Sequence, residues 1–262
     1  MSIALENGHL VRGERKLLDD VSFSLDPGEV VAITGANGAG KTSLLRVLSG
    51  ELKPSSGRVM FDGNPLASIS LESRARSLAV LPQQSSLDFP FIAREVMLMG
   101  RIPHFTGKLV DQAIVDEVTE HLQLGELSNR PYTTLSGGER QRIQIARVLC
   151  QVWDCLDDSY VLLDEPTAPL DLAHQLGVLE LLRELSGRGA GIMLVIHDIN
   201  LAARFCDRMI LMLSGKVVAA GLPTAVVTPA YIKAAFGVDV DVTRTPDGAP
   251  LIYTKAALSV NG

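Results

Sequence analysis

Gly35-Ala36-Asn37-Gly38-Ala39-Gly40-Lys41-Thr42 lies between an apolar run, Val30 to Ile33, and a helical pattern that begins at Ser43. The glycines let the backbone wrap a polyphosphate with successive N–H groups pointing inward. Lys41 would reach the β and γ phosphates, Thr42 would ligate Mg²⁺ through its hydroxyl, and the helix adds the positive end of its dipole. A plain glycine-rich turn is the weaker interpretation, because a strand precedes the motif and a helix follows it. We predict that residues 35–43 bind a nucleoside triphosphate.

A second motif, Leu135-Ser136-Gly137-Gly138-Glu139-Arg140-Gln141-Arg142, precedes a long helical run. Ser136 followed three residues later by Glu139 is a capping box, and the two glycines leave N–H groups open to an anion. Taken alone, such a box usually marks only the start of a helix. Ser136, Gly137 and Gly138 become candidate phosphate contacts in combination with the first motif.

Three apolar runs are each followed by polar residues. The run that begins at Tyr160 ends in Asp164 and Glu165, Gln83 follows another run, and His197 follows a third. Each has a structural alternative, since two acids can cap the next turn and a lone histidine at a strand end is more often structural. The pattern predicts buried strands with candidate catalytic groups at their ends.

Together and in this order, these motifs closely resemble those of the ABC transporter ATPases, and the resemblance covers essentially the whole chain. It implies ATP and Mg²⁺ as cofactors. It also implies that Asp164 holds the metal with Thr42 and Gln83, and that Glu165 polarises the water that attacks the γ-phosphate. By the same resemblance Gln83 contacts that water, and His197 contacts the γ-phosphate.

The resemblance implies an α/β fold: a P-loop NTPase core with a mixed, mainly parallel sheet, an antiparallel β subdomain and an inserted α-helical subdomain. We expect one domain over residues 1–262, with the core and β subdomain in 1–86 and 157–262 and the helical signature subdomain in 87–156. Apolar spacing predicts helices within the insertion and alternating strands and helices after it. Residues 224–262 are expected to form a short helix and a possible terminal strand pair.

Composition excludes several classes of protein. The 262 residues carry a net charge of −6, which argues against a nucleic-acid partner because such a protein needs a basic face. No apolar run approaches the roughly 18 residues that span a bilayer, and the N-terminus lacks a signal pattern. Cys150, Cys155 and Cys206 have no metal-site spacing and are expected to be core thiols. We expect a peripheral subunit on the cytoplasmic face of the bacterial inner membrane.

In this family the phosphate loop and the signature motif do not meet within one chain. The resemblance therefore implies a homodimer with two-fold symmetry that sandwiches two ATP molecules. Each ATP would contact Lys41 of one protomer and Ser136 with Gly138 of the other. Loss of the γ-phosphate would let the sandwich open and drive transport.

Residues 81–91 and 95–101 are similar to the ATPase subunits of importers of iron chelates, cobalamin and haem, and most similar to those of haem importers. The implied partners are two copies of a transmembrane permease and, indirectly, an extracytoplasmic haem-binding protein. A ferric siderophore or cobalamin is the alternative cargo, since this subunit does not touch the cargo. Leu87, Phe89 and Phe91 either contact the permease or pack the subdomain core.

Two other classes are disfavoured. An ABC ATPase that acts on DNA or ribosomes would carry two nucleotide domains or a coiled-coil insert, and a non-hydrolysing subunit would lose Glu165 or His197. Three positions depart from the family pattern. Arg12 lies in the region where an aromatic residue usually stacks on adenine, and its guanidinium either stacks there or is solvated. Pro169 replaces a serine, which puts a hydrogen bond across the dimer in doubt, and Ile92 replaces a capping threonine at a local cost of about 1 kcal/mol.

Overall fold

The computed structural model describes residues 2–83, 87 and 89–257. An antiparallel sheet in the order β2-β1-β4-β5 forms from the N-terminal segment. Its strands are β1 (Ile3–Arg12), β2 (Arg15–Leu25), β4 (Ser56–Phe61) and β5 (Asn64–Pro65). Buried and exposed residues alternate along much of β1, as expected of a sheet with one face on the core.

The second sheet has six strands in the order β10-β9-β3-β8-β7-β6. The five strands from β9 to β6 pair in parallel, and β10 pairs with β9 antiparallel. The strands are β3 (Val30–Thr34), β6 (Leu78–Leu81), β7 (Tyr160–Asp164), β8 (Gly191–Val195), β9 (Arg208–Leu213) and β10 (Lys216–Gly221). The predicted α/β fold with a mixed, mainly parallel sheet and an antiparallel sheet is confirmed.

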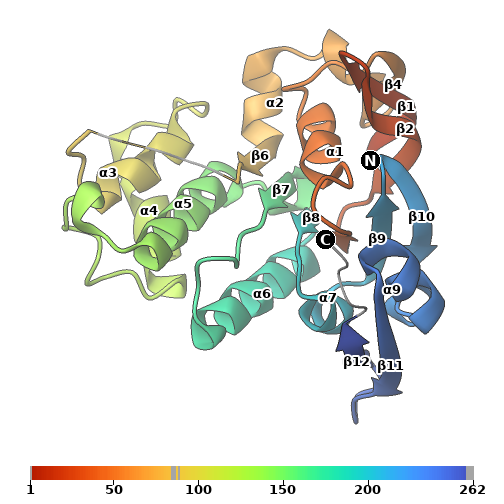
Figure 1. Ribbon diagram of the computed structural model, residues 1–262. Coiled ribbons are helices and arrows are strands. Elements are labelled where there is room, and N and C mark those ends of the chain that lie inside the picture. Colours follow the sequence, from red (N-terminus) through yellow and green to blue (C-terminus); the bar gives the residue numbers. More distant parts are fainter. Residues whose placement is uncertain (1, 84–86, 88, 258–262) are drawn as a thin grey trace.

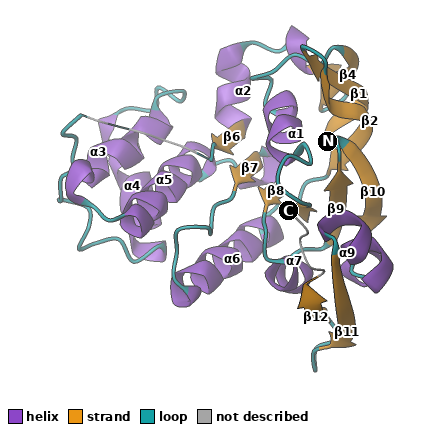
Figure 2. Ribbon diagram, in the orientation of Figure 1, coloured by secondary structure: helices purple, strands orange, loops and turns teal. Residues whose placement is uncertain are grey.

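Helices cover the parallel sheet on both faces, which is why its strands read as continuous apolar runs. Helix α1 (Lys41–Leu48) and the antiparallel sheet lie on one face (Figure 2). Val31 and Ile33 of β3 belong to the core on that face. On the other face Val30 and Ala32 join the core built by helices α5 (Gly137–Val152), α6 (Leu172–Gly187) and α7 (Ile199–Phe205).

A mainly helical region extends to the left in Figure 1. It contains α3 (Ala93–Leu98), the 3₁₀ turn η2 (Met99–Arg101), α4 (Lys108–His121), the 3₁₀ turn η3 (Tyr132–Thr134) and α5. Ile92 precedes α3 and provides no side-chain cap, as its sequence predicts, while Glu95 accepts a 2.9 Å hydrogen bond from the Ile92 N–H. The exact limits of the subdomain, residues 87–156, stay a prediction.

The remaining elements connect and extend the core. They are η1 (Leu66–Ser68), α2 (Leu71–Ser77), η4 (Leu156–Asp158), α8 (Pro223–Val226), α9 (Pro229–Phe236), β11 (Val238–Arg244) and β12 (Pro250–Ala257). The expected short helix and terminal strand pair are thus present. Asn200 of α7 holds β12 through its amide, which accepts from the Ile252 N–H at 2.8 Å and donates to the Ile252 carbonyl at 3.4 Å.

Candidate nucleotide site

Strand order brings the candidate residues to one edge of the sheet. The register of β6, β7 and β8 aligns Leu81 with Leu163 and Asp164 with Val195. The loops that follow these parallel strands therefore begin at the same edge, and β3 with its own following loop is the next strand beyond β8. Gln83, Glu165 and His197, far apart in the sequence, come from neighbouring loops for this reason.

The loop between β3 and α1 has a backbone that only glycine permits at two positions. Gly40 has a φ of +105°, and an added Cβ there would lie 2.6 Å from the Leu17 carbonyl oxygen. Gly35 has a φ of +147° and lies against the Met212 carbonyl. These close approaches explain the glycines that the sequence shows, and they fix the path of the loop.

Lys41 is a buried cation at the start of α1. Its Nζ donates hydrogen bonds of 2.8 Å to the Gly35 carbonyl and 3.0 Å to the Ala36 carbonyl. Burial lowers the pKa of Lys41, although the carboxylates of Glu165 and Asp164 act in the opposite direction. A cation that is partly stripped of water is a strong partner for a phosphate oxygen.

A cavity of about 360 Å³ opens over this loop. The side chains of Gln83 and Glu165 line it together with the continuous segment Asn37–Ser43. Leu17 of β2 also lines it, and sequence reasoning did not single out this residue because an isolated leucine in an alternating strand carries no signal of a site. Arg12, considered for the adenine contact, is not among the described residues that line the cavity.

Asp164 ends β7 with its side chain buried. Only 2% of the residue is exposed, burial raises the pKa of its carboxyl, and a hydrogen bond from Thr42 opposes that rise. Its Oδ1 has no hydrogen-bond partner among the described residues. A buried carboxylate with a free oxygen beside a threonine hydroxyl fits a hard divalent cation such as Mg²⁺, which prefers oxygen ligands.

Glu165 and His197 form the closest pair of titratable groups at this edge. His197 Nε2 lies 2.6 Å from Glu165 Oε1, and the Glu165 N–H donates to the Val195 carbonyl at 3.1 Å. Glu165 has a φ of +53°, which is uncommon for a residue with a side chain and typical of functional sites. His197 lines a smaller cavity of about 140 Å³, which shares Glu165 with the larger one.

Ser136 caps α5 as the sequence predicts. Its hydroxyl accepts from the Glu139 N–H at 3.3 Å, and Glu139 accepts from the Ser136 N–H at 2.7 Å. Ser136, Gly137 and Gly138 are not among the described residues that line the cavity at the phosphate loop. The structure therefore brings Lys41, Thr42, Gln83 and Glu165 together in one chain and leaves the signature residues apart from them.

Comparison with known proteins gives concordant matches. The family model described as ABC transporter matches residues 18–168. The hemin import ATP-binding protein of Pseudomonas putida is 48% identical over 97% of this chain and 100% of that protein. The protein of the same name from Gloeobacter violaceus is 46% identical over 94% of this chain and 91% of that protein.

Two solved structures are also similar. A metal-chelate type ABC transporter in an inward-facing conformation is 26% identical, with a TM-score of 0.80 over 97% of this chain and 98% of the other. A dimeric bacterial ABC transporter cassette is 26% identical, with a TM-score of 0.75 over 84% of this chain and 98% of the other. No helix in the described part of the chain is long and apolar enough to cross a bilayer.

Proposed function

Because this chain belongs to the ABC transporter family, we propose that it hydrolyses ATP to energise the import of haem through a membrane permease. The observation that supports this most directly is the cavity where the phosphate loop, Gln83 and Glu165 meet. The cargo rests on the similarity to hemin import ATP-binding proteins over nearly the full length.

Each residue of the site has a role that its environment supports. The loop N–H groups and Lys41 bind the β and γ phosphates, and Lys41 exchanges its two carbonyl bonds for phosphate oxygens. Thr42, Asp164 and Gln83 would hold Mg²⁺, which when bound neutralises charge on the phosphate oxygens. Asp164 is suited to this role because burial disfavours its ionised form, and a bound cation would stabilise that form.

Glu165 is the proposed acceptor of a proton from the attacking water, because it lines the cavity at the phosphate loop. In the hydrolysis step the water oxygen bonds to the γ-phosphorus, the bond to the β–γ bridging oxygen breaks, and the proton passes to the carboxylate. His197, bonded to Glu165 Oε1, fixes the orientation of this carboxylate and contacts the γ-phosphate. Gln83 borders the same space and orients the water.

We propose a homodimer in which the signature residues complete the site of the partner. Ser136 and Gly138 lie outside the cavity of their own chain, yet the start of α5 presents N–H groups suited to an anion. In a two-fold dimer the start of α5 in one protomer faces the phosphate loop of the other. The similarity to a dimeric cassette supports this arrangement.

The membrane partner is proposed to be two copies of a permease, with an extracytoplasmic haem-binding protein acting through it. The chain then works as a peripheral subunit at the cytoplasmic face of the bacterial inner membrane. Of the three apolar residues considered for this contact, Leu87 and Phe91 pack against the core, whereas Phe89 is 68% exposed. We therefore propose Phe89, the most exposed of the three, as the residue that contacts a permease.

Uptake by cells tests this proposal. Cells that carry the wild-type chain or Glu165→Gln are compared for uptake of haem, a ferric siderophore and cobalamin, with Glu126→Gln as an exposed carboxylate control. Glu165→Gln should retain ATP binding and lower hydrolysis by roughly 10²-fold or more, because the proton acceptor is lost. Haem uptake should fail with it, and the control should match the wild type.

The cargo assignment is overturned if siderophore or cobalamin uptake fails while haem uptake persists. That result would favour the alternative importer and agree with the metal-chelate type neighbour. Normal hydrolysis by Glu165→Gln would instead reject Glu165 as the proton acceptor.

A further inference from the structure

His174 is a histidine at the start of α6 whose ring bonds to two helices. Its Nδ1 lies 2.8 Å from Oδ1 of Asp171, which caps α6, and its Nε2 lies 3.0 Å from Nη1 of Arg142 in α5. It is not among the described residues that line the two cavities that share Glu165. The side chain is 44% exposed, so protons from solvent reach the ring.

The two partners of the ring decide where its protons lie. Arg142 is a donor that stays protonated in proteins, so Nε2 must offer it a lone pair. Asp171 is an ionised acceptor, because the 2.9 Å bond from the His174 backbone N–H lowers the pKa of its carboxyl. Nδ1 therefore carries the proton of a neutral ring. A proton taken up from solvent at Nε2 would occupy the lone pair and leave Arg142 without this acceptor.

The charges around the ring make this bond sensitive to pH. Histidine is the side chain that changes its charge between about pH 5 and pH 8, and the charged groups that face it here are Asp171 and Arg142. Burial lowers the pKa of Arg142, whereas Asp171 and Glu139 act in the opposite direction, and a guanidinium stays charged throughout this pH range. A protonated His174 would therefore place a second cation 3.0 Å from the first. Like charges repel, so the bond between α5 and α6 opens on protonation.

Arg142 also holds the end of α4. Its Nη2 donates to the carbonyls of Leu122 at 2.6 Å and Gln123 at 3.2 Å, the two residues that follow α4. These carbonyls accept a hydrogen bond at any pH. Among the bonds of Arg142 to described side chains and carbonyls, the bond to His174 is thus the titratable one, and it reaches α6.

The start of α5 lies against the segment that leads from β7 to α6. The Gln141 amide donates to the Pro166 carbonyl at 3.1 Å, and a Cβ added to Gly138 would lie 3.1 Å from the Pro169 carbonyl oxygen. Pro166 directly follows the proposed proton acceptor. The bond that His174 accepts is a third point at which α5 meets this part of the chain.

We propose that His174, in its neutral form, is a positioning residue that holds the start of α5 against the segment after β7, and that its protonation slows ATP hydrolysis. When the bond to Arg142 opens, α5 loses one of its attachments to that segment. Ser136 then no longer keeps the position from which, in the proposed dimer, it contacts the ATP of the partner. This inference rests on the proposed function, because it needs that dimer, and it adds a dependence of the rate on pH.

Two substitutions separate the proton-sensitive bond from plain packing. In His174→Gln the side-chain oxygen can accept from Arg142, and the amide does not titrate. In His174→Leu no acceptor remains at any pH. Because the side chain is 44% exposed, neither change is expected to unfold the chain.

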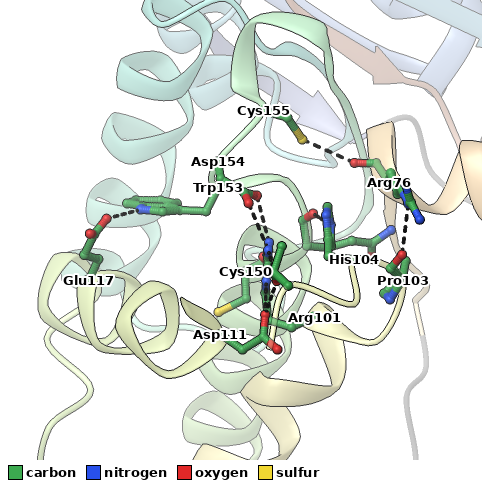
Figure 3. Close-up of polar contacts among 12 residues, drawn as sticks. Arg76, Arg101, Pro103, His104, Asp111, Glu117, Cys150, Trp153, Asp154 and Cys155 are labelled. Carbon is green, nitrogen blue, oxygen red and sulfur yellow. Dashed lines mark hydrogen bonds and ion pairs between the residues drawn. The ribbon is translucent and has the colours of Figure 1, made fainter. Parts of the chain in front are cut away.

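The matched control is His104→Gln. His104, labelled in Figure 3, lies near the other end of α5, with its Nε2 2.6 Å from the Gln151 carbonyl oxygen. A carbonyl accepts from the neutral and from the protonated ring alike, so protonation of His104 leaves this bond in place. Any pH dependence that arises at Glu165 and His197 is common to all variants and cancels in the comparison.

The rate of ATP hydrolysis by the full chain is measured at pH 8 and at pH 5.5, and the ratio of the two rates is compared. We expect the wild-type ratio to exceed that of His174→Gln by at least about threefold, because the glutamine keeps its bond at the lower pH. His174→Gln should retain most of the wild-type rate at pH 8, whereas His174→Leu should be slow at both pH values. His104→Gln should keep the wild-type ratio.

Equal ratios for the wild type and His174→Gln overturn the inference. It is also overturned if His174→Gln and His174→Leu lose the same rate at pH 8, because a role in packing alone predicts that result. Haem uptake by the wild-type chain with its permease is measured separately at pH 8. Failed uptake with the expected ratios rejects the proposed cargo and keeps the role of His174, whereas normal uptake with equal ratios rejects that role and keeps the cargo.

Discussion

Replacing Gly100 by Ala should destabilise the chain more than an added methyl group usually does. Gly100 lies in η2, directly before Arg101, where the backbone passes close to α5. An added Cβ would lie 2.1 Å from the Arg147 carbonyl oxygen and 3.2 Å from the Cys150 Cβ. The first of these atoms belongs to the backbone of a buried helix and cannot swing aside as a side chain would.

The magnitude follows from the overlap. Ordinary contact begins near 3.4 Å, so η2 and α5 must separate by more than 1 Å, and the Arg101 bonds to Cys150 and Asp154 must lengthen with them. Overpacking of a core costs about 1–3 kcal/mol, and because the obstacle here is backbone we expect a cost of about 3 kcal/mol. For a chain of this size that corresponds to a fall of roughly 6–12 °C in the unfolding midpoint.

The assay is thermal unfolding followed by circular dichroism at one scan rate, with Gly177→Ala as the matched control. Gly177 is an exposed residue of α6, and an added Cβ there meets nothing within 4 Å among the described atoms. The control should gain about 0.5–1 kcal/mol from the better helix propensity of alanine. A midpoint for Gly100→Ala equal to or above the wild-type value would refute the close approach of η2 and α5.

Two further predictions concern titratable groups. Burial raises the pKa of Asp164 above its ordinary value of 3.8, so the fold loses stability as the pH rises from about that value through the folded pKa. Asp164→Asn should therefore raise the unfolding midpoint of the nucleotide-free chain at pH 8, and this gain over the wild type should shrink as the pH is lowered toward 3.8, while Mg²⁺-dependent hydrolysis is lost. A gain in scanning fluorimetry that stays the same as the pH is lowered would contradict this. Burial also raises the pKa of Cys150 and Cys206 to about 12 and that of Cys155 to about 11, so all three thiols should resist iodoacetamide at pH 8 until denaturant is added. Mass spectrometry would show a rapidly modified native chain if this reasoning is wrong.

Local signals in the sequence were sufficient for much of the fold. The glycines of residues 35–40 predict a tight loop, the Ser136 and Glu139 pair predicts a helix start, and the apolar run before Asp164 predicts a buried strand. These features depend on neighbours within a few residues, and the structure has all three. The roles proposed for the site residues stay predictions that the kinetic tests address.

Other features could not be predicted because their partners are distant in the sequence. In the sequence nothing distinguishes Arg101 from a surface arginine. Its bonds to Asp111 of α4 and to Asp154, just after α5, form only when the helices pack together. Leu17 lines the nucleotide cavity because the fold brings β2 against the phosphate loop, where Gly40 lies next to the Leu17 carbonyl. In both cases tertiary packing, which a single sequence does not encode in any local pattern, determines the environment of the residue.

The strand order of the central sheet has a consequence for synthesis on the ribosome. Strand β3, which leads to the phosphate loop, pairs with β8 and β9, the second of which ends at Leu213. About 180 residues must be added after β3 before both of its edges can be paired, which takes roughly 10–35 s at ordinary rates of translation. The antiparallel sheet, in contrast, has all four of its strands once Pro65 has been added. The nascent chain therefore carries an apolar strand with unpaired edges through most of its translation, and this is the interval in which we expect it to need protection from aggregation.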